Sequence, residues 1–152
     1  MFAMMETTRL ESLHFAHDPQ TGLKAIIAIH NSRLGPALGG CRYLSYVDEQ
    51  SAIEDALRLA KGMSYKAALA GLPQGGGTAV IIRPAHVENR AALFEAFGRC
   101  IEQLDGRYIT AIDSGTSVAD MDCIAQHTRY VTSTTAAGDP SPHAAMGVFA
   151  GI

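Results

Sequence analysis

The sequence has few of the features that would assign it to a membrane or to nucleic acid. No apolar run approaches the ~20 residues of a membrane span, and residues 1–15 lack the basic start and long apolar stretch of a signal peptide. The 12 Lys and Arg form no run, and the formal net charge is -3, which gives no reason to expect nucleic acid or an anionic membrane as a partner. We therefore expect a cytoplasmic protein without either of these partners.

Cysteine and histidine are also too scattered to indicate a disulfide framework or a metal centre. Cys41, Cys100 and Cys123 are odd in number and form no C-x-x-C pair, which suits a reducing compartment and small buried side chains. Only His14 and His17 come close to ligand spacing, but residues three apart in a strand face opposite sides. We expect no metal site.

The composition is that of an ordinary folded domain. Apolar residues make up 47% of the 152 residues and charged residues 18%, which argues for one core of ordinary size and against disorder.

Hydrophobic periodicity and turn residues divide the chain into alternating helices and strands after residue 47. Before that point, 12–30 is typical of a hairpin with its turn at 18–22, and the glycines and proline of 31–43 break any regular element. The other predicted elements are a helix over 48–63, a strand over 78–83, a helix over 89–104, a strand over 107–113, a helix over 116–128, a short strand over 129–133 and the start of a helix over 141–152. This order predicts an α/β fold, a three-layer sandwich with a mixed, mostly parallel sheet and helices on both faces.

Two of these helices carry recognisable N-terminal caps. Asp48 is a candidate N-cap for the helix that follows it, and Thr116 or Ser117 is a candidate for the helix over 116–128. Asp120 lies where it can reach back to the cap from the first turn.

The stretch GLPQGGGTAVII over 71–82 is one residue short of a phosphate-binding loop. Gly71, Gly76 and Thr78 match the motif G-x-x-x-x-G-K-[ST], but Gly77 stands where its lysine should be. Because a helix precedes these glycines and a strand follows, the order is the reverse of a phosphate-binding loop. The three consecutive glycines instead indicate a bare backbone that a ligand or another strand approaches closely.

Four stretches together resemble one enzyme family. They are LGPALGGCRY (34–43), AIEDALRLAKGMSYKAALAGLPQGGG (52–77), GRYITAIDSGTSVADMD (106–122) and GDPSPHAAMGVFAGI (138–152). In this order they resemble the glutamate/leucine/phenylalanine/valine dehydrogenases, and most closely the leucine-specific branch. The resemblance implies a substrate-binding and oligomerisation domain over 1–137 and the start of the interdomain connecting helix over 138–152. A Rossmann domain normally follows in the family; no G-x-G-x-x-G occurs here, so we expect that domain to be absent from this chain.

The same resemblance assigns substrate-binding roles. Lys66 matches the lysine that holds the α-carboxylate of the amino acid, although without the family it would be an ordinary surface lysine. Gly39 and Gly40 match the backbone that lines the pocket, and Met63 matches a pocket wall, or else continues the apolar core of its helix. Leu38 stands where glutamate enzymes carry a lysine, which implies an aliphatic substrate.

Three further positions bear on catalysis. Asp113 matches the catalytic aspartate that relays protons to and from the amine, although a turn-forming aspartate is the alternative from the residues alone. Thr78 stands in place of the catalytic lysine, and a hydroxyl cannot act as that base. Ala144 stands in place of a threonine that contacts the nicotinamide.

The resemblance therefore implies the substrate-binding N-terminal domain of an NAD-dependent branched-chain L-amino-acid dehydrogenase. Its partners would be a small aliphatic L-amino acid or 2-oxo acid and further copies of the chain. We expect this chain alone to be inactive, because Thr78 replaces the lysine and the cofactor domain is missing. The alternative is a catalytically inactive oligomerisation or regulatory module derived from the family.

Overall fold

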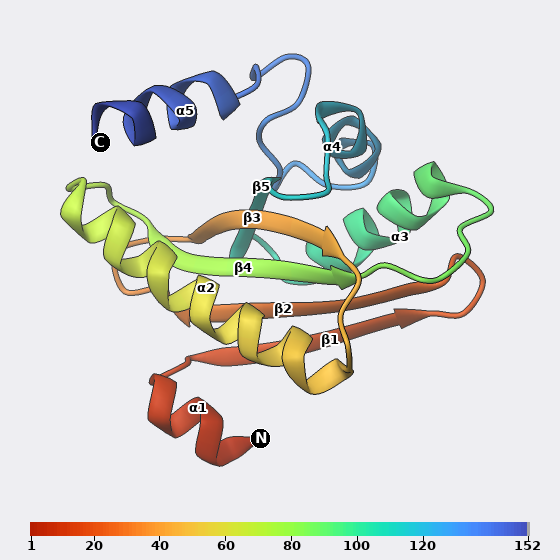
Figure 1. Ribbon diagram of the computed structural model, residues 1–152, viewed down its shortest axis with the longest axis horizontal. Helices are drawn as coiled ribbons and strands as arrows, with labels where there is room; N and C mark the ends of the chain where they lie inside the picture. Colours follow the sequence, from red (N-terminus) through yellow and green to blue (C-terminus); the bar gives the residue numbers. More distant parts are fainter. Residues whose placement is uncertain (152) are drawn as a thin grey trace.

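A five-stranded sheet runs through the centre of the protein (Figure 1). The computed structural model describes residues 1–151, and the strands lie in the order β1-β2-β4-β3-β5. The strands are β1 (Ser12–Asp18), β2 (Leu23–Asn31), β3 (Ala37–Leu44), β4 (Gly75–Ile82) and β5 (Tyr108–Ile112). The helices are α1 (Phe2–Thr8), α2 (Glu49–Leu69), α3 (Arg90–Glu102), α4 (Val118–Ala125) and α5 (Ser141–Ala150).

The sheet is mixed, and about half of it is parallel. β1 and β2 form the predicted antiparallel hairpin, and β2 also pairs with β4 antiparallel. β3 pairs with β4 and with β5, in both cases parallel. The prediction of a mostly parallel sheet was therefore wrong. The reason is that the Ile-rich β2 is buried along almost its whole length, so it lies inside the sheet rather than at its edge.

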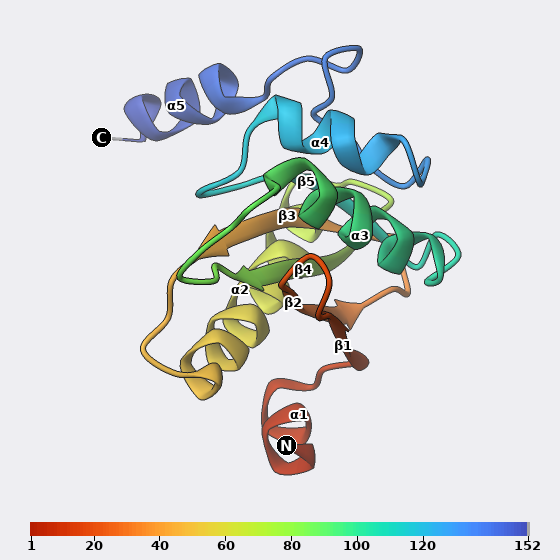
Figure 2. The same ribbon diagram turned by 90° about the vertical axis from the view of Figure 1, so that its right-hand side faces the viewer.

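The apolar core consists of two clusters that share the sheet. Ile27 and Ile29 of β2 belong to the cluster that contains the apolar side chains of α3 and α4. Ile26 and Ala28 belong to the cluster that contains those of α2. Since successive side chains of a strand point to opposite faces, α2 and α3 pack against different faces of the sheet (Figure 2).

The glycine-rich segments are strands, which corrects the prediction that 31–43 is irregular. A Cβ at Gly39 would overlap the carbonyl oxygen of Gly77 on the neighbouring strand, so only glycine fits there. A Cβ at Gly76 would overlap the backbone of Ser64 on α2. Gly75–Gly77 thus lack side chains because strand and helix backbones approach them. Of the two alternatives for these glycines, a ligand or another strand, the structure shows close approach by neighbouring backbone.

Three other segments differ from the prediction. α2 continues six residues past Met63, because Lys, Ala and Leu sustain a helix without an apolar stripe. α1 was not predicted, since it has no side-chain cap and no buried residue. Residues 129–133 form only an isolated bridge from Val131 to Thr110, and the left-handed backbone of Ser133, at φ 59°, ends the extended conformation. No helix within residues 1–151 has both the length and the apolar content needed to cross a membrane.

An ion pair between α3 and α4 fixes the loop between β5 and α4. Ser117 caps α4, and the Asp120 side chain accepts a hydrogen bond from the Ser117 backbone N–H, which confirms the predicted capping arrangement. Arg90, at the start of α3, donates two hydrogen bonds of 2.8 Å to the Asp120 carboxylate. It also donates to the carbonyl oxygen of Gly115, so the loop that follows Asp113 is tied to α3.

We expect Asp120→Asn to destabilise the fold at neutral pH by about 1.5–3 kcal/mol, the value of a hydrogen bond to a charged group. Burial alone would raise the pKa of Asp120, but hydrogen bonds from Arg90 and Ser117 outweigh burial and lower it. A depressed folded-state pKa means that the stabilisation is complete above the unfolded pKa of about 3.9 and is lost as the pH falls through the folded pKa. Urea unfolding at pH 7 and at pH 3 measures the effect. A difference between the variant and the original chain that does not shrink at pH 3 would contradict this assignment.

Candidate functional site

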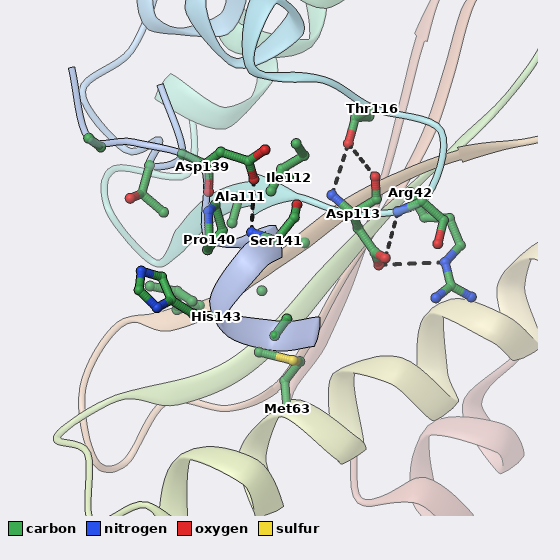
Figure 3. Close-up of a pocket in the computed structure, with 18 of the residues that line it drawn as sticks. Arg42, Met63, Ala111, Ile112, Asp113, Thr116, Asp139, Pro140, Ser141 and His143 are labelled. Carbon is green, nitrogen blue, oxygen red and sulfur yellow. Dashed lines mark hydrogen bonds and ion pairs between the residues drawn. The ribbon is translucent and has the colours of Figure 1, made fainter. Parts of the chain in front are cut away.

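A cavity of about 940 Å³ lies between β3, α2, β5 and the start of α5 (Figure 3). Its polar lining includes a guanidinium, an ammonium, two carboxylates and an imidazole. These belong to Arg42, Lys66, Asp113, Asp139 and His143. Its apolar lining includes Leu38, Leu59, Met63, Ala111, Ile112 and Ala144.

The cavity brings together most of the residues that the sequence singled out. The seven that line it are Leu38, Gly39, Gly40, Met63, Lys66, Asp113 and Ala144. Met63 is half-buried and faces the cavity, so it is a wall of the site as well as part of the α2 stripe (Figure 3). Thr78 is the exception, because it is not among the lining residues.

The strand register and the direction of α2 order these groups along the cavity. Cys41 pairs with Ile112 in parallel β3 and β5, so Asp113 follows β5 at the level of Arg42. Leu38 lies four residues before Arg42 on β3, about 13 Å away along the strand. α2 runs in the opposite direction, because its Asp55 contacts Arg42 while Met63 lies near Gly39. Lys66, almost one turn beyond Met63, therefore lies toward the Leu38 end.

Thr78 lies beside Gly40 on the neighbouring strand β4, on the same face of the sheet as the cavity, and supports the cavity floor. Its side chain is 1% exposed, and its Oγ1 donates a hydrogen bond of 3.0 Å to the carbonyl oxygen of Gly40. The fully buried Tyr108 hydroxyl donates in the same way to the Gly39 carbonyl oxygen, at 2.8 Å. Burial raises the pKa of Tyr108 well above its usual value, so this hydroxyl stays a donor. Two hydroxyl groups thus hold the backbone of the glycine pair.

Asp113 is held at the end of β5 by its own loop. Its Oδ1 accepts a hydrogen bond of 2.6 Å from the backbone N–H of Ser114. Its backbone N–H donates to the Thr116 hydroxyl, which in turn donates to the Cys41 carbonyl oxygen of β3. The other carboxylate oxygen, Oδ2, lies 3.5 Å from Nε of Arg42 (Figure 3). The carboxylate therefore faces the cavity with one oxygen held by the backbone and the other facing a cation.

Sequence reasoning missed three of the charged or titratable residues in this lining. Arg42 comes two residues after Gly40, and the period of a strand would have placed it on the same face. His143 directly precedes Ala144, on the first turn of α5. Asp139 accepts a hydrogen bond of 2.8 Å from the backbone N–H of Ser141 and so orders the start of that helix. No sequence motif pointed to Asp139 or His143.

Comparison with known sequences identifies one family. A family profile described as Glu/Leu/Phe/Val dehydrogenase, dimerisation domain, matches residues 9–130. The chain is 54% identical over 156 residues to leucine dehydrogenase of Geobacillus stearothermophilus, which covers 100% of this chain and 42% of that protein. It is 49% identical over 146 residues to valine dehydrogenase of Streptomyces virginiae, covering 93% of this chain and 41% of that protein. The chain thus spans less than half the length of these relatives.

Solved structures show the same architecture. The crystal structure of L-tryptophan dehydrogenase from Nostoc punctiforme superimposes with a TM-score of 0.82 and 44% sequence identity, over 86% of this chain and 39% of that one. A hetero-hexameric glutamate dehydrogenase from Thermus thermophilus superimposes with a TM-score of 0.72 over 90% of this chain and 41% of that one. At 20% identity the second likeness shows the fold alone.

Proposed function

This chain belongs to the Glu/Leu/Phe/Val dehydrogenase family, and we propose that it is the substrate-binding part of an NAD-dependent branched-chain L-amino-acid dehydrogenase. The parent reaction oxidises the amino acid to an imine, which water converts to a 2-oxo acid and ammonia. The observation that supports this proposal is the single cavity in which Leu38, Lys66 and Asp113 meet the bare backbone of Gly39 and Gly40.

Each of these groups has a task that its chemistry suits. The Lys66 ammonium is exposed on α2 and binds the α-carboxylate of the substrate as a compact positive charge. The Asp113 carboxylate, opposite it along the cavity, contacts the amino group and holds or releases its proton. Gly39 and Gly40 have no side chains, so the substrate backbone can approach the floor of the cavity closely.

Leu38 supports an aliphatic substrate class. An apolar side chain at this position removes water from a leucine, valine or isoleucine side chain at a gain in free energy. A glutamate side chain would place a second carboxylate beside Leu38 without a partner, which is costly. We therefore assign leucine, valine or isoleucine as the substrate class.

Residues 1–151 do not by themselves fit the cofactor that the family name implies. The methyl group of Ala144, at the position that the resemblance assigns to a nicotinamide contact, can donate and accept no hydrogen bond. No glycine-rich turn between a strand and a helix, of the kind that holds a pyrophosphate, occurs in these residues. The roles proposed for Lys66, Asp113 and the glycine pair therefore concern the substrate only.

We expect the chain to bind 4-methyl-2-oxopentanoate, the 2-oxo acid of leucine, and Lys66→Ala to weaken this binding about 10- to 100-fold. The reason is the loss of a charge-assisted hydrogen bond to the carboxylate, which is worth about 1.5–3 kcal/mol. Titration followed by NMR measures both dissociation constants. Lys61→Ala is the matched control, because Lys61 lies on the same helix but outside the cavity. Equal affinity of the two variants, or no binding by the original chain, would refute the proposal.

The second candidate function is an inactive oligomerisation or regulatory module. Thr78 and Ala144 favour it, since both replace groups that the resemblance assigns to chemistry. The two candidates share the substrate cavity and differ only in whether a reaction occurs there. The activity of a Thr78→Lys variant separates the two candidates.

We also propose that the chain forms homo-oligomers, as the dimerisation domain of its family description suggests. β1 is an edge strand of the sheet, and its Phe15 is 59% exposed. Pairing of this edge with a second copy would cover both the apolar side chain and the free backbone groups. We expect sedimentation at micromolar concentration to show a dimer or a larger species, and Phe15→Lys to shift the distribution toward monomer. A strictly monomeric original chain would contradict this proposal.

A further inference from the structure

We propose that Arg42 is a positioning residue that orients the Asp113 carboxylate toward the amino group of the substrate. The inference rests on the proposed function, because it assumes that an amino acid occupies the cavity. It stands on the position of the Arg42 guanidinium between two carboxylates from different elements (Figure 3).

The guanidinium connects α2 to the end of β5. Arg42 lies on β3, and its side chain is 19% exposed. One terminal nitrogen donates a hydrogen bond of 2.9 Å to Oδ2 of Asp55 on α2. Nε faces Oδ2 of Asp113 at 3.5 Å, which is an ion pair but too long for a strong hydrogen bond. Within residues 1–151 this buried Nε has no hydrogen-bond partner.

Asp55 holds the far side of the guanidinium in place. Its Oδ2 also accepts a hydrogen bond of 2.8 Å from the Tyr46 hydroxyl, and its Oδ1 accepts one of 2.7 Å from Arg58. Burial opposes ionisation of Asp55, but these hydrogen bonds and the charge of Arg42 outweigh it and lower its pKa. Asp55, whose ionised form these contacts favour, therefore holds the Arg42 guanidinium beside Asp113.

The free Nε donor explains how Arg42 acts on Asp113. A small rotation of the carboxylate shortens the 3.5 Å contact to a hydrogen bond. With Oδ1 held by Ser114 and Oδ2 facing Arg42, the carboxylate has one defined orientation toward the cavity. Arginine keeps its charge at every pH at which the protein is folded, so the cation that faces Asp113 is always present.

The consequence is a difference between two ligands that share a carbon skeleton. L-Leucine has an ammonium group that contacts Asp113, whereas 4-methyl-2-oxopentanoate has a carbonyl there. Both ligands have the carboxylate that Lys66 binds. Loss of Arg42 should therefore weaken leucine binding selectively, whereas a purely structural defect would weaken both.

The experiment is an NMR titration of this chain with both ligands, for the original sequence, Arg42→Gln and Arg58→Gln. Arg58→Gln is the matched control, since it removes the same charge from the same Asp55 but lies outside the cavity with a side chain 71% exposed. We expect Arg42→Gln to weaken leucine binding about tenfold, as for the loss of an oriented charge-assisted hydrogen bond, and to change 2-oxo acid binding less than about twofold. Arg58→Gln should leave both affinities unchanged.

Each result decides the proposal. Equal losses for the two ligands, or no loss for either, would overturn the role of Arg42 while leaving the proposed function intact. Failure of the original chain to bind either ligand would overturn both. If Arg42→Gln does not fold, Arg42→Lys replaces it: lysine offers one nitrogen in place of the planar fork whose separate nitrogens face Asp55 and Asp113, so leucine should again be weakened more than the 2-oxo acid. Equal affinities in that variant would count against the proposal.

Discussion

Replacing Thr78 by lysine should raise the rate of leucine deamination by about 10²–10⁴-fold, the usual contribution of a positioned general base. The enzyme for this measurement is a chimaera in which the chain replaces the matching 42% of leucine dehydrogenase from Geobacillus stearothermophilus. A lysine desolvated near other cations has a pKa lowered toward neutrality and can take a proton from the water that attacks the imine. Threonine has no group that can do so.

The surroundings of Thr78 indicate that the cavity is within reach of a longer side chain. Thr78 shares the β4 face of Val80, which packs beneath α2, and its Oγ1 already contacts the Gly40 carbonyl at the cavity floor. A lysine at this position extends past that carbonyl toward Met63.

Thr78→Met is the control for this substitution, because methionine has a similar length and no basic nitrogen. We expect kcat to rise only in the lysine variant, with little change in KM for leucine, because a base acts on the chemical step rather than on binding. If both variants fold and neither gains activity, the cavity has diverged at more than one position. The inactive-module function would then be the better one.

The position of Thr78 also shows what the sequence could not predict. Its identity was visible and the family resemblance implied a lysine at its position, but its buried hydrogen bond to Gly40 depends on the pairing of β3 with β4. A sequence without this register cannot say whether the hydroxyl is exposed to the cavity or buried beside it. The structure buries it against the Gly40 carbonyl oxygen, so Thr78 supports the floor and is not among the residues that line the cavity.

Local signals explain the parts of the fold that were predicted correctly. The hairpin over 12–30 has a glycine at its turn with φ of 75°, and α3 and α4 begin at the capping residues Asn89 and Ser117. The errors arose where a long-range contact decides the conformation. Gly39 lies in a strand because the backbone of Gly77 excludes any side chain there, and no pattern within ten residues reveals this.

The same contrast between local signals and long-range contacts applies to the residues of the candidate site. Residues with a family match, such as Lys66 and Asp113, were identified from motifs, and the structure placed both at one cavity. Arg42 was overlooked because its significance depends on Asp55 and Asp113, which are 13 and 71 residues away in the chain and meet it only through α2 and β5 packing.

Asp113→Asn in the Thr78→Lys chimaera should lower kcat by about 10²–10⁴-fold, because an amide cannot exchange a proton with the amine. The substitution keeps the shape of the side chain, and the amide oxygen can still accept the hydrogen bond from Ser114. The loop that follows β5 is also held by Thr116 and by Arg90, so the fold should persist. Steady-state rates over a range of leucine concentrations, with thermal denaturation to check folding, measure the effect.

Asp139→Asn is the matched control, since Asp139 lines the same cavity but its carboxylate is used to order the start of α5. An amide can accept the same hydrogen bond from Ser141, so we expect this variant to keep the activity of its parent within about threefold, consistent with a surface substitution. If Asp139→Asn lowered kcat as much as Asp113→Asn, the rate would depend on the total negative charge of the cavity rather than on one carboxylate. The proton relay would then not belong to Asp113, and the orienting role of Arg42 would lose its purpose. A large loss confined to Asp113→Asn would instead place proton transfer at the one carboxylate that both the backbone of its loop and the Arg42 guanidinium hold toward the substrate.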